Sequence, residues 1–317
     1  MKKRLITSMF ILLGFGVAFV SRIWTLYVFD LLMMAMAVMG AVEVGRVLER
    51  QGKYVNFVAV ASMPAVLYLL FTVVIRLNLI WQYLLIFFLS ALLVYFAVIF
   101  TVTMCAKKTT QEEMKKYELS DEKPYRYAID KAVYSLTVLI YPSLLFMALI
   151  MINHFYELSF IAGMGYDFNI FTWFMLTSVF VVTIMTDTMA YVVGSTVKGP
   201  KLCPLISPNK TISGAIGGLV GGVASGMGLY GLFCINDIFK VEMFAIGCEW
   251  WILLAVFVLG SILSQIGDIL ASALKRRARV KDYGTIFPGH GGIMDRMDGN
   301  IFNAFLSLVS FMLIFLV

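Results

Sequence analysis

The sequence predicts an all-α protein that crosses a membrane about nine times, and three observations support this fold class. Hydrophobic residues make up 61% of the 317-residue chain and charged residues only 14%, whereas an ordinary soluble domain is nearer half apolar and a quarter charged. Apolar runs of about 20 residues, the length that spans a bilayer as a helix, recur along the chain. The basic residues gather in alternate connections between these runs. A soluble globular enzyme is therefore excluded.

Each predicted span is a charge-poor apolar run between polar residues. We interpret the first run, after the basic start Met1-Lys2-Lys3-Arg4, as a retained helix rather than a cleaved signal peptide. A second span follows it at once, and no small-residue cleavage site stands between them. The nine predicted spans are Leu5–Val20, Trp24–Val42, Phe57–Ile75, Leu79–Met104, Val133–Ile152, Ile170–Val193, Gly214–Ile235, Phe244–Ile266 and Ile301–Val317.

The distribution of Lys and Arg predicts which end of each span faces the cytoplasm. With the N-terminus inside, 22 of the 25 basic residues fall in cytoplasmic segments, and only Arg22, Arg76 and Lys240 fall outside. Cytoplasmic loops usually carry this excess, so the net charge of +6 indicates topology rather than a nucleic-acid partner. The short loops favour a bacterial cytoplasmic (inner) membrane. We expect an N-terminal region, 1–132, with four spans, and a C-terminal catalytic region, 133–317, with five.

Two intramembrane carboxylates require an explanation, because an ionisable group at the bilayer centre costs about 2.5 to 3.5 kcal/mol. Asp187 shares a helical face of the sixth span with Thr183 and Thr186. Hydrogen bonding between helices would account for the hydroxyl groups alone, but two carboxylates near the same membrane surface favour a site. Asp268 lies on a polar face of the eighth span that also carries Ser261, Ser264, Gln265, Ser272 and Lys275.

The densest group of polar residues follows the eighth span. Asp295 and Asp298 stand three apart, so they project from one side if a helical turn begins there. Paired carboxylates beside basic side chains suit a divalent cation and phosphate groups, and glycines let backbone N–H groups approach phosphate closely. A basic loop on anionic lipid headgroups would explain only the cations. The group comprises Lys275, Arg276, Lys281, Asp282, His290, Gly291, Gly292, Asp295, Arg296 and Asp298.

A second cytoplasmic loop carries Ser207, Lys210 and Thr211 just before the glycine-rich seventh span. A hydroxyl residue there can cap the helix, and the helix N-terminus can bind an anion. The glycines of the span indicate close helix packing. Whether that packing lies within the chain or in a homodimer is left open by the sequence.

The stretch from Ser272 to Asp298 resembles, position for position over 27 residues, the signature of the phosphatidate cytidylyltransferases, also called CDP-diacylglycerol synthases. The segments 187–194 and 207–211 are similar to further parts of that family's pattern. The resemblance thus covers the C-terminal 130 or so residues. Three positions differ: members commonly carry Glu in place of Ala271 and of Ser213, and Lys in place of Asn209.

The resemblance implies that CTP and phosphatidic acid react in a cavity at the cytoplasmic ends of the helices, giving CDP-diacylglycerol and pyrophosphate. A lipid phosphate oxygen is already anionic, so His290 is expected to support its turn rather than carry a proton. The implied metal is Mg²⁺, with a second cation such as K⁺ left open, and its implied ligands are Asp268, Asp295 and Asp298. Implied catalytic residues are Lys275, Arg276, Lys281, Asp282, His290 and Arg296. Implied substrate-binding residues are Asp187, Ser207, Lys210, Thr211, Ser272, Gly291 and Gly292.

Three other functions are compatible with parts of the sequence. A CTP-dependent kinase or nucleotidyltransferase could act on another lipid, such as a polyprenol. A transporter also uses intramembrane carboxylates, but an inverted-repeat transporter would show two related halves, and here the polar features crowd into one half. A catalytically inactive homologue acting as a membrane scaffold would suit the departures at Ala271 and Ser213.

Overall fold

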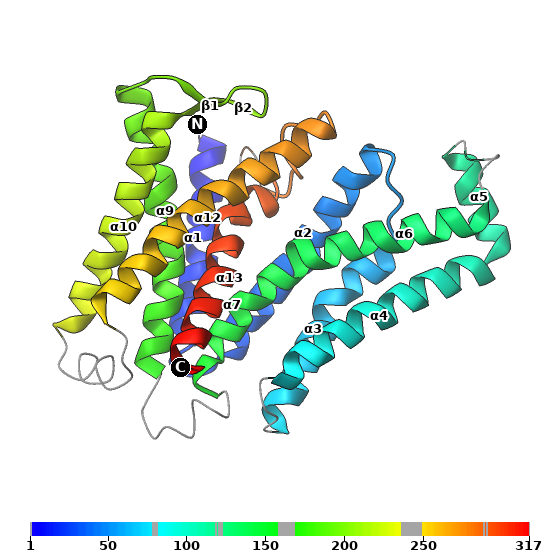
Figure 1. Cartoon of the computed structure of the whole chain (residues 1–317), viewed down its shortest axis with the longest axis horizontal. Helices are drawn as coiled ribbons and strands as arrows, with labels where there is room; N and C mark the ends of the chain where they lie inside the picture. The colour runs from blue at the N-terminus through cyan, green and yellow to red at the C-terminus, as the bar shows by residue number, and fades with distance from the viewer. Residues whose placement is uncertain are drawn as a thin grey trace.

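The computed structural model describes residues 2–77, 82–117, 119, 123–157, 169–235, 249–287, 289 and 291–316. These residues form a bundle of helices with one short β-hairpin (Figure 1). Seven of the described helices are long and apolar enough to cross a membrane, or eight if the bent pair α4 (Gln82–Cys105) and α5 (Lys107–Lys116) counts as one span. The all-α polytopic membrane class is confirmed, and the number nine remains a prediction.

The helices extend beyond the apolar runs that predict them. α12 (Trp250–Arg277) continues past Ile266 to Arg277, and α13 (Met294–Leu316) begins at Met294 rather than at Ile301. Helical hydrogen bonding does not stop where charged residues begin, because their side chains pack against other parts of the chain. The remaining helices are α1 (Lys2–Ser21), α2 (Tyr27–Arg50), α3 (Phe57–Arg76), α6 (Pro124–Val138), η1 (Leu139–Leu144), α7 (Leu145–Asn153), η2 (Phe155–Glu157), α9 (Asn169–Thr196) and α10 (Ile212–Cys234).

The predicted fifth span is longer than its apolar run and contains a π-helical segment. α6, η1 and α7 follow one another along the chain and together form one candidate span, Pro124–Asn153, which is kinked at Tyr141, where the backbone is not helical. η1 contains Pro142, which has no backbone N–H and interrupts the α-helical hydrogen bonds.

Two short antiparallel strands, β1 (Lys201–Cys203) and β2 (Ser207–Thr211), connect α9 to α10. The sequence predicts no strand here, because β2 contains Pro208, Asn209 and Lys210, which have low β propensity. Thr211 closes the hairpin and caps α10, its hydroxyl accepting a hydrogen bond from the amide of Gly214 at 3.1 Å. The predicted cap is confirmed. We call the end of the bundle that carries this hairpin the hairpin end.

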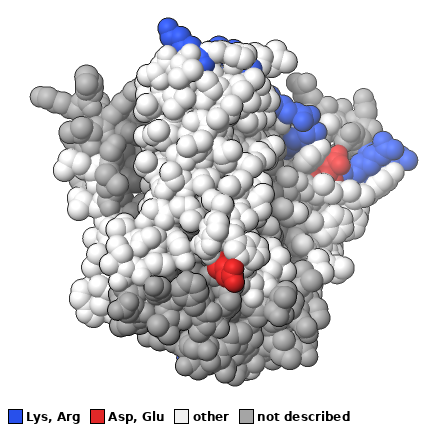
Figure 2. Space-filling view, turned by 60° about the vertical axis from the view of Figure 1, so that its left-hand side comes forward, with Lys and Arg blue, Asp and Glu red and all other residues white. Residues whose placement is uncertain are grey.

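The two ends of the bundle differ in charge. α1 begins at the hairpin end and α13 ends at the opposite end (Figure 1). Figure 2 shows Lys and Arg side chains in the upper part of the face it draws, which is the hairpin end, and no Lys or Arg among the described residues in the lower part. This is the distribution that the predicted cytoplasmic orientation of the hairpin end requires.

The glycines of α10 allow close packing within the chain. A β-carbon at Gly214 would lie 2.7 Å from the carbonyl oxygen of Ala190, and one at Gly218 would lie 2.8 Å from that of Thr186. Gly226 packs in the same way against Phe257 of α12. From the sequence, the glycine face of α10 could pack either within the chain or in a homodimer. In the structure these glycines contact α9 and α12 of the same chain.

We expect Gly218→Ala to lower the free energy of unfolding by about 1–3 kcal/mol, because the added methyl group overpacks the contact with α9. Gly228→Ala, on the same helix with open space around it, should leave stability unchanged or raise it slightly. Denaturant unfolding of the purified variants in detergent measures both. Equal effects of the two substitutions would contradict the packing.

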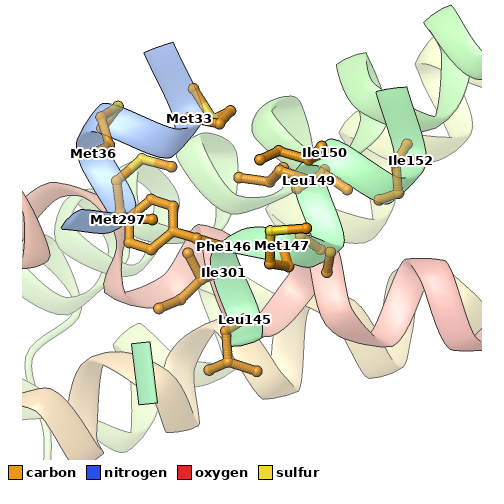
Figure 3. Packing of buried hydrophobic residues seen from close by; sticks show 14 of the residues in the cluster. Met33, Met36, Leu145, Phe146, Met147, Leu149, Ile150, Ile152, Met297 and Ile301 are labelled. Carbon is orange, nitrogen blue, oxygen red and sulfur yellow. The ribbon is translucent and has the colours of Figure 1, made fainter. Parts of the chain in front are cut away.

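One hydrophobic core joins both halves of the chain. Figure 3 shows Met33 and Met36 of α2 beside Phe146 of α7 and Met297 and Ile301 of α13. All five side chains are at most 4% exposed. The N-terminal helices thus support the elements that carry the C-terminal polar segment.

A buried polar cluster lies at the end opposite the hairpin. Asp30 of α2 accepts hydrogen bonds from the side-chain amide of Asn153 at 2.8 Å and from Nε2 of the His154 ring at 2.6 Å. The other ring nitrogen of His154 contacts Glu157 at 2.7 Å, and Arg22 donates to Asn153 at 2.5 Å. Burial lowers the pKa of His154, but its hydrogen bonds to the two carboxylates raise it by more, to about 9. The ring is therefore protonated at neutral pH.

His154 should make the stability of the bundle depend on pH. Because its folded pKa of about 9 exceeds the unfolded value of about 6.5, protonation stabilises the folded state fully below pH 6.5, and this contribution is lost as the pH rises to 9. The shift corresponds to about 3 kcal/mol. Unfolding measured from pH 6 to 9.5 should show this decline in the wild type and a flat profile in His154→Gln. An equal decline in both proteins would assign it to other groups.

Candidate active site

Three helices meet closely near the hairpin end of the bundle. A β-carbon at Gly299 of α13 would lie 2.6 Å from the hydroxyl of Ser264 on α12 and 3.2 Å from the methyl group of Thr183 on α9. A β-carbon at Gly267 would lie 2.7 Å from the carbonyl oxygen of Asp298. These glycines bring the backbones of α9, α12 and α13 into contact.

Three carboxylates surround this junction. Asp187 and Asp268 stand one helical turn beyond Thr183 and Ser264, toward the hairpin end, and Asp298 immediately precedes Gly299. The negative charges of Asp187 and Asp268 repel that of Asp298, which is only 9% exposed. Close carboxylates of like charge require cations nearby. Asp187 and Asp268, from the polar faces of the sixth and eighth predicted spans, line the same pocket.

A pocket of about 510 Å³ opens beside the junction, between α9, the hairpin, α10 and α12. Lys210 from β2 crosses it and forms an ion pair with Asp268, with 2.5 Å between Nζ and Oδ2. The volume of the pocket lies in the range of small-ligand sites. The polar residues that line the pocket include Asp187, Tyr191, Asn209, Lys210, Thr211, Gln265 and Asp268.

A second ion pair lies further along α12 toward the hairpin end. The ammonium group of Lys275 is 2.6 Å from Oδ1 of Asp295, and both side chains are nearly buried. The other oxygen of Asp295 accepts hydrogen bonds from the amides of Tyr283 and Gly292, at 2.8 and 2.9 Å. Asp295 therefore ties α12, the signature loop (residues 278–293) and α13 together.

The other predicted residues of α12 and the signature loop occupy different settings. Ser272 donates a 3.4 Å hydrogen bond to Asp268. Arg276 donates to the carbonyl oxygens of Ile206 in the hairpin turn and Val280, both at 3.3 Å, so it holds the hairpin against α12. Lys281 and Asp282 are exposed. His290 lies outside the described residues.

The predicted substrate-binding glycines, Gly291 and Gly292, contact the carboxylate of Asp295. Gly291 has φ +84°, and a β-carbon there would overlap the carboxylate of Asp295. The amide of Gly292 donates to the same carboxylate. Arg296 is exposed, and its charge acts on Asp187. Ser207 opens β2 and pairs with Cys203 rather than lining the pocket.

The positions that differ from the family pattern have local roles. Ser213 donates a hydrogen bond to the carbonyl oxygen of Lys198, which fastens the start of the connection to the start of α10. Ala271 is fully buried, and its carbonyl oxygen accepts a 3.2 Å hydrogen bond from the hydroxyl of Tyr283.

Glu43 of α2 is not among the residues predicted from the sequence, and its buried carboxylate accepts hydrogen bonds from the amides of Ile293 and Met294. The predicted second span ends at Val42, so Glu43 was placed beyond the membrane. An acidic residue inside the longer helix would have been the signal. Gln265, which donates to the carbonyl oxygen of Ala215 at 3.2 Å, also joins the pocket lining.

The predicted magnesium ligands differ in how well they suit a metal. Within the described part of the chain, no group of three or more His, Cys, Asp or Glu side chains is arranged to hold an ion. Asp295 has both oxygens engaged by Lys275 and two amides. Asp268 also has a contact on each oxygen, from Lys210 and Ser272. Asp298 and Asp187 beside it offer the hard oxygen atoms that Mg²⁺ prefers, and the repulsion among the three carboxylates favours a cation.

A bundle of apolar helices with a charged pocket at one end defines a membrane protein with a site for a polar ligand. The sequence model described as Cytidylyltransferase family matches residues 2–315. The chain therefore belongs to the cytidylyltransferase family.

Bacterial relatives are similar over part of the chain. A phosphatidate cytidylyltransferase of Staphylococcus haemolyticus (strain JCSC1435) is 42% identical over 125 residues, which are 39% of this chain and 43% of that protein. One of Brucella abortus biovar 1 (strain 9-941) is 41% identical over 120 residues, 38% of this chain and 40% of that protein. The aligned part spans less than half the length of these relatives.

Proposed function

We propose that the protein is a phosphatidate cytidylyltransferase of a bacterial cytoplasmic membrane, with the hairpin end in the cytoplasm. One oxygen of the phosphate group of phosphatidic acid attacks the α-phosphorus of CTP. The new P–O bond forms as the bond to the β-phosphate breaks, and pyrophosphate leaves with its electron pair. The observation that carries the proposal is the pocket in which Lys210 and Asp268 meet beside Asp187. The family and its similar relatives supply the chemistry.

The surroundings of the pocket suit a lipid acceptor. The helices that line it expose apolar side chains next to it, among them Ile216 of α10 and Ile266 and Leu270 of α12. Acyl chains can therefore remain in the bilayer while the phosphate group reaches the pocket. The soluble nucleotide enters from the cytoplasmic side, where the basic residues gather.

The residues of the chain meet the main difficulty, which is to bring two polyanions together. Lys210 and Arg296 place positive charge at the carboxylates, and Lys275 adds a nearly buried ammonium group. Bound Mg²⁺, held by Asp268 and Asp298 with Asp187 beside them, would supply further charge neutralisation and align the reacting groups. No side chain is needed as a base, because the attacking phosphate oxygen is already anionic.

Labelled CTP distinguishes this reaction from a CTP-dependent lipid kinase. The purified protein is incubated in detergent with Mg²⁺ and phosphatidic acid, and in parallel with a polyprenol. Label at the α-phosphate should enter the lipid product from phosphatidic acid, and label at the γ-phosphate should leave with pyrophosphate. Transfer of the γ-label to either lipid would replace the proposal with a kinase.

A further inference from the structure

Glu43 connects the N-terminal half of the chain to the signature loop. Glu43 is 1% exposed and lies 250 residues before Ile293, the last residue of the loop. One oxygen accepts a hydrogen bond from the amide of Ile293 at 3.1 Å, and the other accepts from the amide of Met294 at 3.0 Å. These amides belong to the first residue of α13 and the residue before it.

The Glu43 carboxylate supplies hydrogen-bond acceptors to the first amides of α13, a role that residues next to a helix in the sequence usually have. The first amides of a helix have no partner within the helix, and a side chain from the preceding residue commonly caps them. Here the cap comes from another helix and carries a full charge, which strengthens the hydrogen bonds and complements the helix dipole. The start of α13 is thereby fixed relative to α2.

The signature loop is built around this carboxylate. A β-carbon at Gly284 or at Gly292 would overlap the Glu43 carboxylate, so glycine at both positions leaves room for it. Between these glycines the loop returns to α13, where Asp295 binds the amides of Tyr283 and Gly292. Glu43 therefore binds the amides at the start of α13, and Asp295 binds the amides of Tyr283 and Gly292 in the loop before it.

We infer that Glu43 is a positioning residue, which sets the first turn of α13 and through it the places of Asp295, Lys275 and Asp298. This inference rests on the proposed cytidylyltransferase reaction for its catalytic consequence. Glu43 lines no part of the pocket that the structure shows. Its loss should therefore lower kcat more than it changes KM for CTP.

The test compares Glu43→Gln with Glu49→Gln. Both change a glutamate of α2 to its neutral isostere, and Glu49 accepts its hydrogen bond from Tyr117, away from the loop. In Glu43→Gln, hydrogen exchange followed by mass spectrometry should quicken about tenfold in a peptide covering 291–298, through loss of a charge-assisted hydrogen bond. Peptides from α9 and α10 should exchange as in the wild type, and kcat should fall about tenfold with KM for CTP within about twofold. Glu49→Gln should change none of these.

Three results would overturn the inference. Unchanged exchange at 291–298 would show that the contact does not hold the turn, and faster exchange throughout the bundle would show a role in overall stability alone. An unchanged kcat would remove the catalytic consequence. If Glu43→Gln does not fold, the wild type still decides, because the amides of Ile293 and Met294 should be protected and rapid exchange there excludes the contact. If the wild type folds but has no activity, the proposed function is wrong. The positioning role of Glu43 can still be tested in that case, because the exchange measurement needs no substrate.

Discussion

Asp268→Asn should lower the rate of CDP-diacylglycerol formation at least about hundredfold while the protein stays folded. The carboxylate pairs with Lys210 in the pocket, where the charges of the nucleotide and the lipid phosphate must be balanced. Removing one preorganised hydrogen-bonding group from an active site can cost a factor of about 100 to 1,000. The ion pair is partly exposed, so its loss should cost little stability. Product formation at saturating CTP and denaturant unfolding measure the two effects.

The matched control for this substitution is Asp130→Asn. Asp130 lies on α6, outside the pocket, and the change removes the same charge. Its activity should equal that of the wild type. Equal losses in both variants, or nearly full activity in Asp268→Asn, would contradict the assignment of the pocket as the reaction site.

Asp295→Asn should destabilise the protein as well as inactivate it. The substitution leaves the nearly buried ammonium group of Lys275 without its counter-charge and weakens the acceptor for two amides. Breaking a buried ion pair by removing one partner costs about 3 to 5 kcal/mol. Denaturant unfolding should therefore show a large loss for Asp295→Asn, unlike Asp268→Asn.

A double-mutant cycle with Lys275→Met separates the pair from the rest of the site. The double variant should be more stable than the sum of the two single losses predicts, because the unpaired charge is gone. Activity should stay low in all three variants. Additive losses of stability would show that Lys275 and Asp295 do not depend on each other.

Helical periodicity predicted which residues share a face, and the structure confirms this for α12. Asp268, Ser272 and Lys275 follow one another along the helix and face polar partners. Periodicity does not identify those partners, because they come from other elements. Asp295 was expected to hold a metal, but it binds Lys275 and the loop amides in the structure.

The hairpin and Glu43 could not be predicted for a different physical reason. Strands of three and five residues with Pro and Lys in them have little intrinsic preference, and their pairing depends on the helices at both ends. Glu43 acts through a contact between residues 250 positions apart. The chain carries no local signal of such a contact beyond one acidic residue at the end of an apolar run.

The family and the pocket also bear on the alternatives. Membership of the cytidylyltransferase family favours an enzyme over a transporter, for which the intramembrane carboxylates were the only support. The ion pair with Lys210 gives the intramembrane carboxylate of Asp268 a partner without an ion pathway. An inactive scaffold would retain the same contacts, so only catalysis distinguishes it from the proposed enzyme.

The most direct measurement is the product stoichiometry of the purified wild-type protein with CTP, phosphatidic acid and Mg²⁺. Mass spectrometry of the lipid and an assay of pyrophosphate should find one CDP-diacylglycerol for each pyrophosphate released, and no product when Mg²⁺ is removed by a chelator. A folded protein that forms no CDP-diacylglycerol under these conditions would contradict the proposed function.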